Sequence, residues 1–185
     1  LLTTSIPESF TPELASRLSG TDAPLAMLDY LDRARLFLVH LDTRGQWFRY
    51  HHLFRDFLLR RLQESGSQCA PQLHAQAARW YLDQQDSVNA TWHFLRSDQP
   101  RQAADLLEKS GSTMLNNGLH ATFQAQLELL PPHFVQERPQ LGLLIADYLF
   151  GNTYREMNLY FVHRTEDRVI PDQVFVPRGE PDLTQ

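Results

Sequence analysis

The stretch that decides the fold is QWFRYHHLFRDFL, residues 46–58. Residues 47–50 are aromatic except for Arg49, and the alternation Phe48-Arg49-Tyr50 is typical of a short β-strand. From residue 52 onward the apolar side chains recur at helical spacing. A helix is therefore predicted over about residues 52–63, with an apolar face made by Leu53, Phe54, Phe57, Leu58 and Leu62. Its arginines are expected to lie outside that face, at Arg55, Arg60 and Arg61.

Upstream residues complete a small domain around this stretch. Residues 36–39 are apolar and partly β-branched, and residues 42–45 have turn composition, so they predict a β-hairpin with residues 47–50. Two helices are predicted before it, over about residues 11–18 and from residue 23. The order helix, helix, hairpin, helix is close to a winged helix. A small α+β domain without a nucleic-acid role fits the same pattern.

Downstream residues predict stacked helices. Apolar positions recur at helical spacing after five start signals, at Pro71, Asp86, Pro100, Gly118 and Pro139. We expect Gly111 to end or loosen the third of these helices. Short loops make sequential helices antiparallel, which is typical of a solenoid resembling tetratricopeptide repeats, although the spacing is shorter than the usual period of about 34 residues. The predicted fold class is mainly α.

The composition divides the chain into three parts. Small polar residues at 64–68 predict a boundary, which gives a winged-helix-like domain at residues 1–66 and a helical-repeat domain at 67–150. Residues 151–185 form an unassigned tail with two short predicted strands, at 158–162 and 173–176. This tail is either an irregular extension or a foreign or frame-shifted end.

Charge and single residue types narrow the function classes. The net charge is -5, and residues 1–66 hold eight arginines and eight acidic residues, so no domain-wide nucleic-acid footprint is present. The only lysine, Lys109, follows an acid and not a glycine, which excludes a phosphate-binding loop. The only cysteine, Cys69, excludes an intrachain disulfide. Neither a membrane span nor a secretory signal is predicted, so the cytoplasm is the expected compartment.

Several spaced motifs together resemble one family. Residues 31–42 (LDRARLFLVHLD) and 46–58 are followed by Leu73-His74 with Ala77-Ala78 and Trp80-Tyr81, then by Ala103-Ala104, Leu129-Leu130-Pro131 and Arg138-Pro139. This order resembles the large ATP-dependent LuxR-type transcriptional regulators, the group of the maltose-regulon activator. The likeness spans about residues 1–150, and the tail has no counterpart in it.

The resemblance implies an internal piece of a larger regulator. An ATP-binding domain would precede it and a helix-turn-helix DNA reader would follow it, so ATP or ADP belongs to the parent protein and no cofactor is expected here. The implied partners are its own ATPase domain or other protomers, and an inhibitory protein or a small inducer. DNA contact is expected through the C-terminal domain, and no membrane partner is expected.

The resemblance also singles out candidate site residues. In related signal-transduction ATPases a histidine of the winged-helix domain reaches the nucleotide phosphates, which points here to His51 or His52. Because neighbours on a helix point in different directions, we expect only one of the two to face a ligand. Arg44, Arg49 and Arg55 are candidate phosphate or DNA contacts, or else a solvated face with acidic partners such as Asp29 beside Arg33.

No catalytic or metal site is predicted, because the remaining histidines show no ligand spacing and no nucleophile has a recognisable partner. The sequence thus favours a non-enzymatic regulatory module that couples nucleotide state to interactions of the helical part. The alternatives are direct DNA binding by the winged helix and a plain helical-repeat scaffold for protein interactions.

Overall fold

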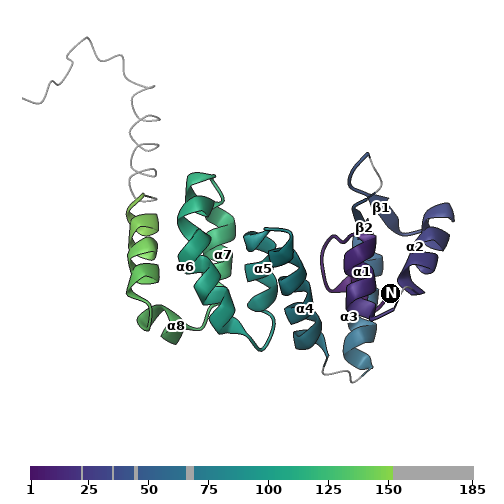
Figure 1. Cartoon of the computed structure of the whole chain (residues 1–185), viewed down its shortest axis with the longest axis horizontal. Helices are drawn as coiled ribbons and strands as arrows, with labels where there is room; N and C mark the ends of the chain where they lie inside the picture. The colour runs from purple at the N-terminus through teal and green to yellow at the C-terminus, as the bar shows by residue number, and fades with distance from the viewer. Residues whose placement is uncertain (22, 35, 44–45, 66–68, 152–185) are drawn as a thin grey trace, which may run out of the picture. The chain divides into compact units, whose positions relative to one another are not determined.

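A computed structural model describes residues 1–21, 23–34, 36–43, 46–65 and 69–151. It is mainly helical with one small antiparallel sheet, which confirms the predicted fold class of a winged helix followed by helical repeats (Figure 1). The chain divides into two compact units, Leu1–Leu144 and Ile145–Gln185. The strands predicted in the tail lie outside the described residues, and the division into three parts drawn from the sequence stays a prediction.

The winged-helix part contains a short 3-10 helix, η1 (Thr3–Ser5), and the helices α1 (Pro12–Ser19), α2 (Ala23–Arg33) and α3 (His52–Glu64). α1 begins and ends where the sequence predicts. The Thr11 hydroxyl accepts a hydrogen bond from the backbone N–H of Leu14, at 3.2 Å. Gly20 ends the helix with a φ of 70°, a left-handed conformation that glycine adopts without steric cost.

The predicted hairpin is formed by β1 (Leu38–His40) and β2 (Phe48–Tyr50), with Val39 opposite Arg49. A third segment extends it, because Phe10 and Phe48 exchange two backbone hydrogen bonds of 2.9 Å. At the turn, the Asp42 carboxylate accepts hydrogen bonds from the backbone N–H groups of Trp47 and Gln46, which lower its pKa. The sequence predicts the hairpin but not the pairing of Phe10.

The helical part contains α4 (Ala70–Asp83), α5 (Ser87–Phe94), α6 (Pro100–Asn116), α7 (His120–Leu129) and α8 (Pro132–Gln136), and residues 139–151 are also helical. α4 packs against α5, α5 against α6, and α6 against α7 (Figure 1). The loops between them are short, so each helix runs back along the one before it.

The expectation that Gly111 ends or loosens a helix is wrong. This residue lies inside α6 and is buried. A Cβ placed there would collide with the side chain of Leu144 and would approach Cε2 of Phe123 to 3.0 Å. The missing Cβ of glycine therefore lets the side chains of Leu144 and Phe123 approach α6 closely, and this packing offsets the cost of glycine in helix propensity.

One hydrophobic core passes from the winged helix into the first helical pair. Phe10, Leu14 and Tyr50 belong to the same buried cluster as Leu73 and Trp80. The indole rings of Trp47 and Trp80 meet edge to face with centroids 5.9 Å apart. The two parts that the sequence separates at about residue 66 are therefore joined by shared burial of apolar surface.

Polar contacts tie the same junction together. The Tyr81 hydroxyl donates to the carbonyl oxygen of Ser9 at 3.0 Å, and Arg17 of α1 forms an ion pair of 2.8 Å with Asp83 at the end of α4. Burial raises the pKa of Tyr81 to about 12, so this phenol stays a hydrogen-bond donor throughout the neutral range.

Gly111 and Gly142 provide a matched pair of substitutions in helices. Gly111→Ala should lower the free energy of unfolding by about 1 kcal/mol or more, because overpacking outweighs the gain in helix propensity. Gly142→Ala should raise it by up to about 1 kcal/mol, because a Cβ there meets no atom within 4 Å. Urea unfolding of both variants measures the difference. Equal shifts in the two would contradict this account of α6.

Candidate functional site

The first candidate site is a hollow of about 270 Å³ at the start of α3, which we call the histidine hollow. His51 precedes the helix with extended backbone angles (φ -54°, ψ 137°), and His52 is its first residue. Both are exposed, and their ring centroids lie 4.3 Å apart. The hollow is lined by Glu8, Val39, Arg49, Tyr50, His51, His52, Arg55 and Asp56.

The two histidines do not diverge as expected. Because His51 lies outside the helix, the directions that hold for successive helical residues do not apply to it, and both residues line the same hollow. The His51 side chain makes no capping hydrogen bond to the helix start. Either ring can therefore donate to or accept from a group placed in the histidine hollow.

The three candidate arginines have different surroundings. Arg49 is the exposed central residue of β2 and lines the histidine hollow. Arg55 was expected on the outer face of α3, but it is half-buried and faces the N-terminal segment. Arg44 lies outside the described residues. Four of the candidate residues named from the sequence, Arg49, His51, His52 and Arg55, thus line one hollow, although Arg55 was predicted on the outer face of α3.

Arg55 is held by backbone carbonyl groups. Its Nε donates to the carbonyl oxygens of Ser5 at 3.0 Å and Pro7 at 3.4 Å, and its Nη2 donates to that of Ile6 at 3.1 Å. These bonds fix the segment between η1 and α1 against α3. The apolar side chains of Leu53 and Phe57, expected on the buried face, are instead 66% and 54% exposed. α3 is therefore rotated relative to the predicted orientation.

Other arginines of the winged-helix part have acidic neighbours. Arg33 forms an ion pair of 2.9 Å with Asp29 at the predicted helical spacing of four, and Arg61 pairs with Glu64 at 3.3 Å. These exposed pairs contribute little stability, but they reduce the free positive charge of the surface.

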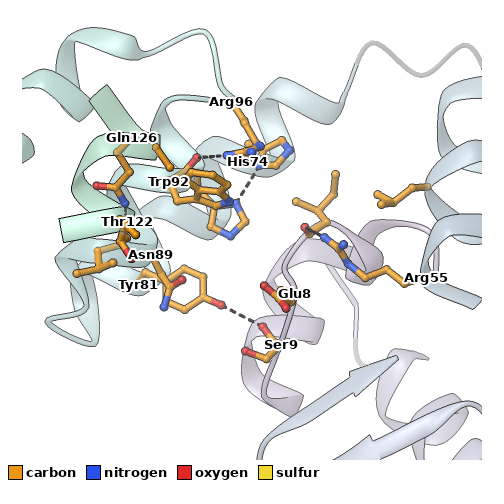
Figure 2. A pocket seen from close by; sticks show the side chains of 16 residues that line it. Glu8, Ser9, Arg55, His74, Tyr81, Asn89, Trp92, Arg96, Thr122 and Gln126 are labelled. Carbon is orange, nitrogen blue, oxygen red and sulfur yellow. Dashed lines mark hydrogen bonds between the residues drawn. The ribbon is translucent and has the colours of Figure 1, made fainter. Parts of the chain in front are cut away.

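The second candidate site is a larger cavity of about 760 Å³, which we call the junction cavity. Figure 2 shows Glu8, Ser9 and Arg55 of the winged-helix part on one side of it, and Tyr81, Trp92, His74 and Arg96 of the helical part on the other. Asn89 of α5 and Thr122 and Gln126 of α7 also line it. No sequence pattern indicates this cavity, because its residues come from five separate segments.

A histidine pair lies at the wall of the junction cavity. Nδ1 of His74 and Nδ1 of His93 are 2.9 Å apart, and the His93 ring stacks on Tyr81 with centroids separated by 5.3 Å. Burial, together with the positive charges of Arg96 and Arg55, lowers the pKa of His74 to about 4. Burial, together with His74 and the same two arginines, lowers the pKa of His93 to about 3. At neutral pH both rings are uncharged, so one donates its Nδ1–H and the other accepts.

The pair could not be found from spacing, because its members are 19 residues apart on different helices. One feature of the sequence could have indicated that His93 is buried: it lies three residues after Ala90, on the buried face of α5.

Among the described residues, no group of three or more His, Cys, Asp and Glu could hold a metal ion. In the same part of the chain, no helix is long and apolar enough to cross a lipid bilayer.

Residues 1–70 match the family described as "MalT winged helix domain". The match supports the resemblance to large ATPase regulators of the MalT type. It also assigns α1, α2, the hairpin and α3 to a known kind of winged helix, with the histidine hollow inside the matched region.

Curated relatives extend the likeness into the helical part. The proteins named "Serine/threonine-protein kinase PknK" of Mycobacterium tuberculosis (strain ATCC 25618 / H37Rv) and of Mycobacterium bovis (strain ATCC BAA-935 / AF2122/97) are each 34% identical to this chain over 146 residues. The aligned region is 79% of this chain and 13% of each relative. The chain thus spans about an eighth of the length of the curated relatives that it matches.

Arg55 should matter for stability in a way that Arg49 does not. Arg55→Ala removes the charged donor from three backbone carbonyls and should lower the free energy of unfolding by about 2 kcal/mol. Arg49→Ala, at an exposed strand position, should change it by less than about 0.5 kcal/mol. Urea unfolding followed by circular dichroism measures both. Similar losses in the two variants would refute the role given to Arg55.

The histidine pair predicts a pH dependence of stability. Both pKa values are lowered on folding, so between pH 6.5 and about 4 the unfolded chain binds protons that the folded chain does not. The free energy of unfolding should therefore fall as the pH drops through this range, by at most about 1.4 kcal/mol per pH unit for each histidine.

Urea unfolding at pH 7, 6 and 5 tests this dependence. The slope should be smaller in His93→Gln, which removes one of the two groups, and unchanged in His133→Gln, an exposed histidine of α8. An unaltered slope in His93→Gln would show that other groups cause the dependence.

Proposed function

We propose that this chain is a regulatory piece of a MalT-like, LuxR-type ATP-dependent transcriptional activator that acts in the cytoplasm. In this proposal the winged helix docks on an ATPase domain of the same protein, which binds ATP or ADP, and transmits the nucleotide state to the helical part. The helical part contacts another protomer, an inhibitory protein or a small inducer. The proposal assigns no catalytic step to these residues and leaves DNA reading to a separate domain.

The shared core is the observation that carries the proposal. The buried cluster that includes Phe10 and Tyr50 continues through Trp80 of α4, and the Tyr81–Ser9 and Arg17–Asp83 contacts flank it. A winged helix joined in this way cannot reorient without carrying α4 and α5 with it. Such a coupling is what a relay between a nucleotide-binding domain and a helical sensor requires.

The histidine hollow supports a nucleotide contact. His51 and His52 are exposed and have ring nitrogens that can donate to phosphate oxygens, and the Arg49 cation lines the same hollow. A phosphate group of a nucleotide held by the docked ATPase domain would meet these donors together. We therefore propose that the hollow, and not one histidine alone, senses the nucleotide.

The names of the two mycobacterial relatives describe protein kinases. Those names belong to chains of which the aligned region is 13%, so phosphoryl transfer is not proposed here. Direct DNA binding is the competing function. Arg55 is a poor candidate for a DNA contact, because its Nε and Nη2 already donate to backbone carbonyls. Arg49 is the better candidate, because it is exposed on β2.

The test is association of the purified chain with the ATPase domain of its parent protein, measured by isothermal titration calorimetry with ADP and with ATP. We expect the two nucleotides to give dissociation constants that differ at least tenfold. His51→Gln and His52→Gln should reduce this difference, while His133→Gln on α8 should leave it unchanged.

Two results would count against the proposal. Equal binding in ADP and ATP would remove the coupling role. Micromolar, salt-sensitive binding of the chain to duplex DNA that is lost in Arg49→Ala would favour the winged helix as a direct DNA binder.

A further inference from the structure

The junction cavity has the size and composition of a small-molecule site. Its volume of about 760 Å³ lies within the range of about 300–1,000 Å³ that is usual for ligand pockets. Its walls combine aromatic side chains with a few polar groups from separate elements, as Figure 2 shows. The nucleotide contact proposed above uses Arg49, His51 and His52, none of which lines the junction cavity, although Glu8 and Arg55 line both this cavity and the histidine hollow.

Two arginines in this cavity lack acidic partners. Arg17, Arg33, Arg61, Arg101 and Arg138 each lie within 4.0 Å of a carboxylate oxygen. In the described part of the chain no such ion pair involves Arg55 or Arg96, although Glu8 also lines the cavity. Their positive charges are therefore available to a ligand.

Both guanidinium groups are held in place but keep unused donors. Arg55 donates through Nε and one N–H of Nη2, so its Nη1 has no partner among the described residues. The Arg96 guanidinium lies 3.7 Å from the centre of the Trp92 ring, and its Nη1 donates to the Trp92 carbonyl at 3.3 Å. A fixed guanidinium with free N–H groups is suited to paired hydrogen bonds with a carboxylate or phosphate.

The other groups facing the cavity do not neutralise this charge. Burial lowers the pKa of Arg96, and the positive charge of Arg55 lowers it as well. His74 and His93 stay uncharged at neutral pH, and Tyr81 stays a phenol, so these three offer hydrogen bonds without charge. The cavity therefore combines two cations, one carboxylate and several neutral donors and acceptors.

We propose that the junction cavity binds a small organic anion, a carboxylate or a phosphate ester, between Arg55 of the winged-helix part and Arg96 at the end of α5. The oxyanion would accept hydrogen bonds from both guanidinium groups, and the neutral polar side chains of Asn89 and Thr122 would contact the rest of the molecule.

Such a ligand would act on the junction itself. Arg55 fixes residues 5–7 of the winged-helix part, and Arg96 belongs to the helical part, so the anion would bind only when the two parts are packed together. Binding would favour the packed arrangement over any state in which the junction opens. This role rests on the proposed function, in which the junction transmits the nucleotide state, whereas the binding site itself does not.

Isothermal titration calorimetry of the 185-residue chain with citrate and with glucose 6-phosphate tests the site, with glucose and added sodium chloride as controls. We expect saturable binding of at least one of the two anions with a submillimolar dissociation constant, and none of glucose. Binding of citrate alone would identify a carboxylate site, and binding of glucose 6-phosphate alone would identify a phosphate-ester site.

Arginine variants locate the binding. Arg96→Gln removes a charge from an exposed side chain and should weaken binding at least tenfold with the fold intact by circular dichroism. Arg79→Gln, an exposed arginine of α4 outside the cavity, should change it less than twofold. If the Arg55→Gln variant folds, its affinity for the same anions provides a second test of the site.

Absence of saturable binding by both anions, or equal weakening in Arg96→Gln and Arg79→Gln, would overturn the site. Because no ATPase domain or nucleotide is present in this titration, its failure leaves the nucleotide-dependent association to be judged by its own experiment.

Discussion

The burial of Trp80 and Tyr81 against the winged helix is the constraint on which the rest of the structure depends. Both lie on α4, yet they belong to the buried cluster that includes Phe10 and Tyr50, and Trp47 meets Trp80 edge to face. Two separate domains would each have to cover their own apolar surface. Here the winged helix and α4 bury this surface against one another, which removes it from water.

Arg55 links the features of the winged-helix part. It holds the carbonyl groups of residues 5–7, and it lines both the histidine hollow and the junction cavity. A charge so placed has two effects. It stabilises the segment that precedes α1, and its field helps to keep His74 and His93 uncharged. In the proposed relay, a single guanidinium would thus lie between the surface that senses a nucleotide and the cavity at the base of the helical part.

Much of the fold could be predicted because its signals are local. Thr11 and Gly20 fix the ends of α1 through a cap and a left-handed residue, and the alternation at residues 47–50 indicates a strand. The errors arose where a distant neighbour decides. Gly111 looked like a helix end, but Leu144 and Phe123 require it inside α6. Arg55 looked exposed by helical periodicity, but the carbonyls of residues 5–7 lie against that face of α3.

The candidate sites show the same difference between features set by local sequence and features set by distant contacts. The sequence by itself determined the mainly helical class, the order of the elements and the adjacency of His51 and His52, because capping, periodicity and chain neighbourhood act within a few residues. Only the tertiary structure decided that both histidines line one hollow, that His74 meets His93, and that Arg55 and Arg96 face a common cavity. Those meetings depend on how α3, α4 and α5 pack, and packing is set by the summed burial of side chains far apart in the chain.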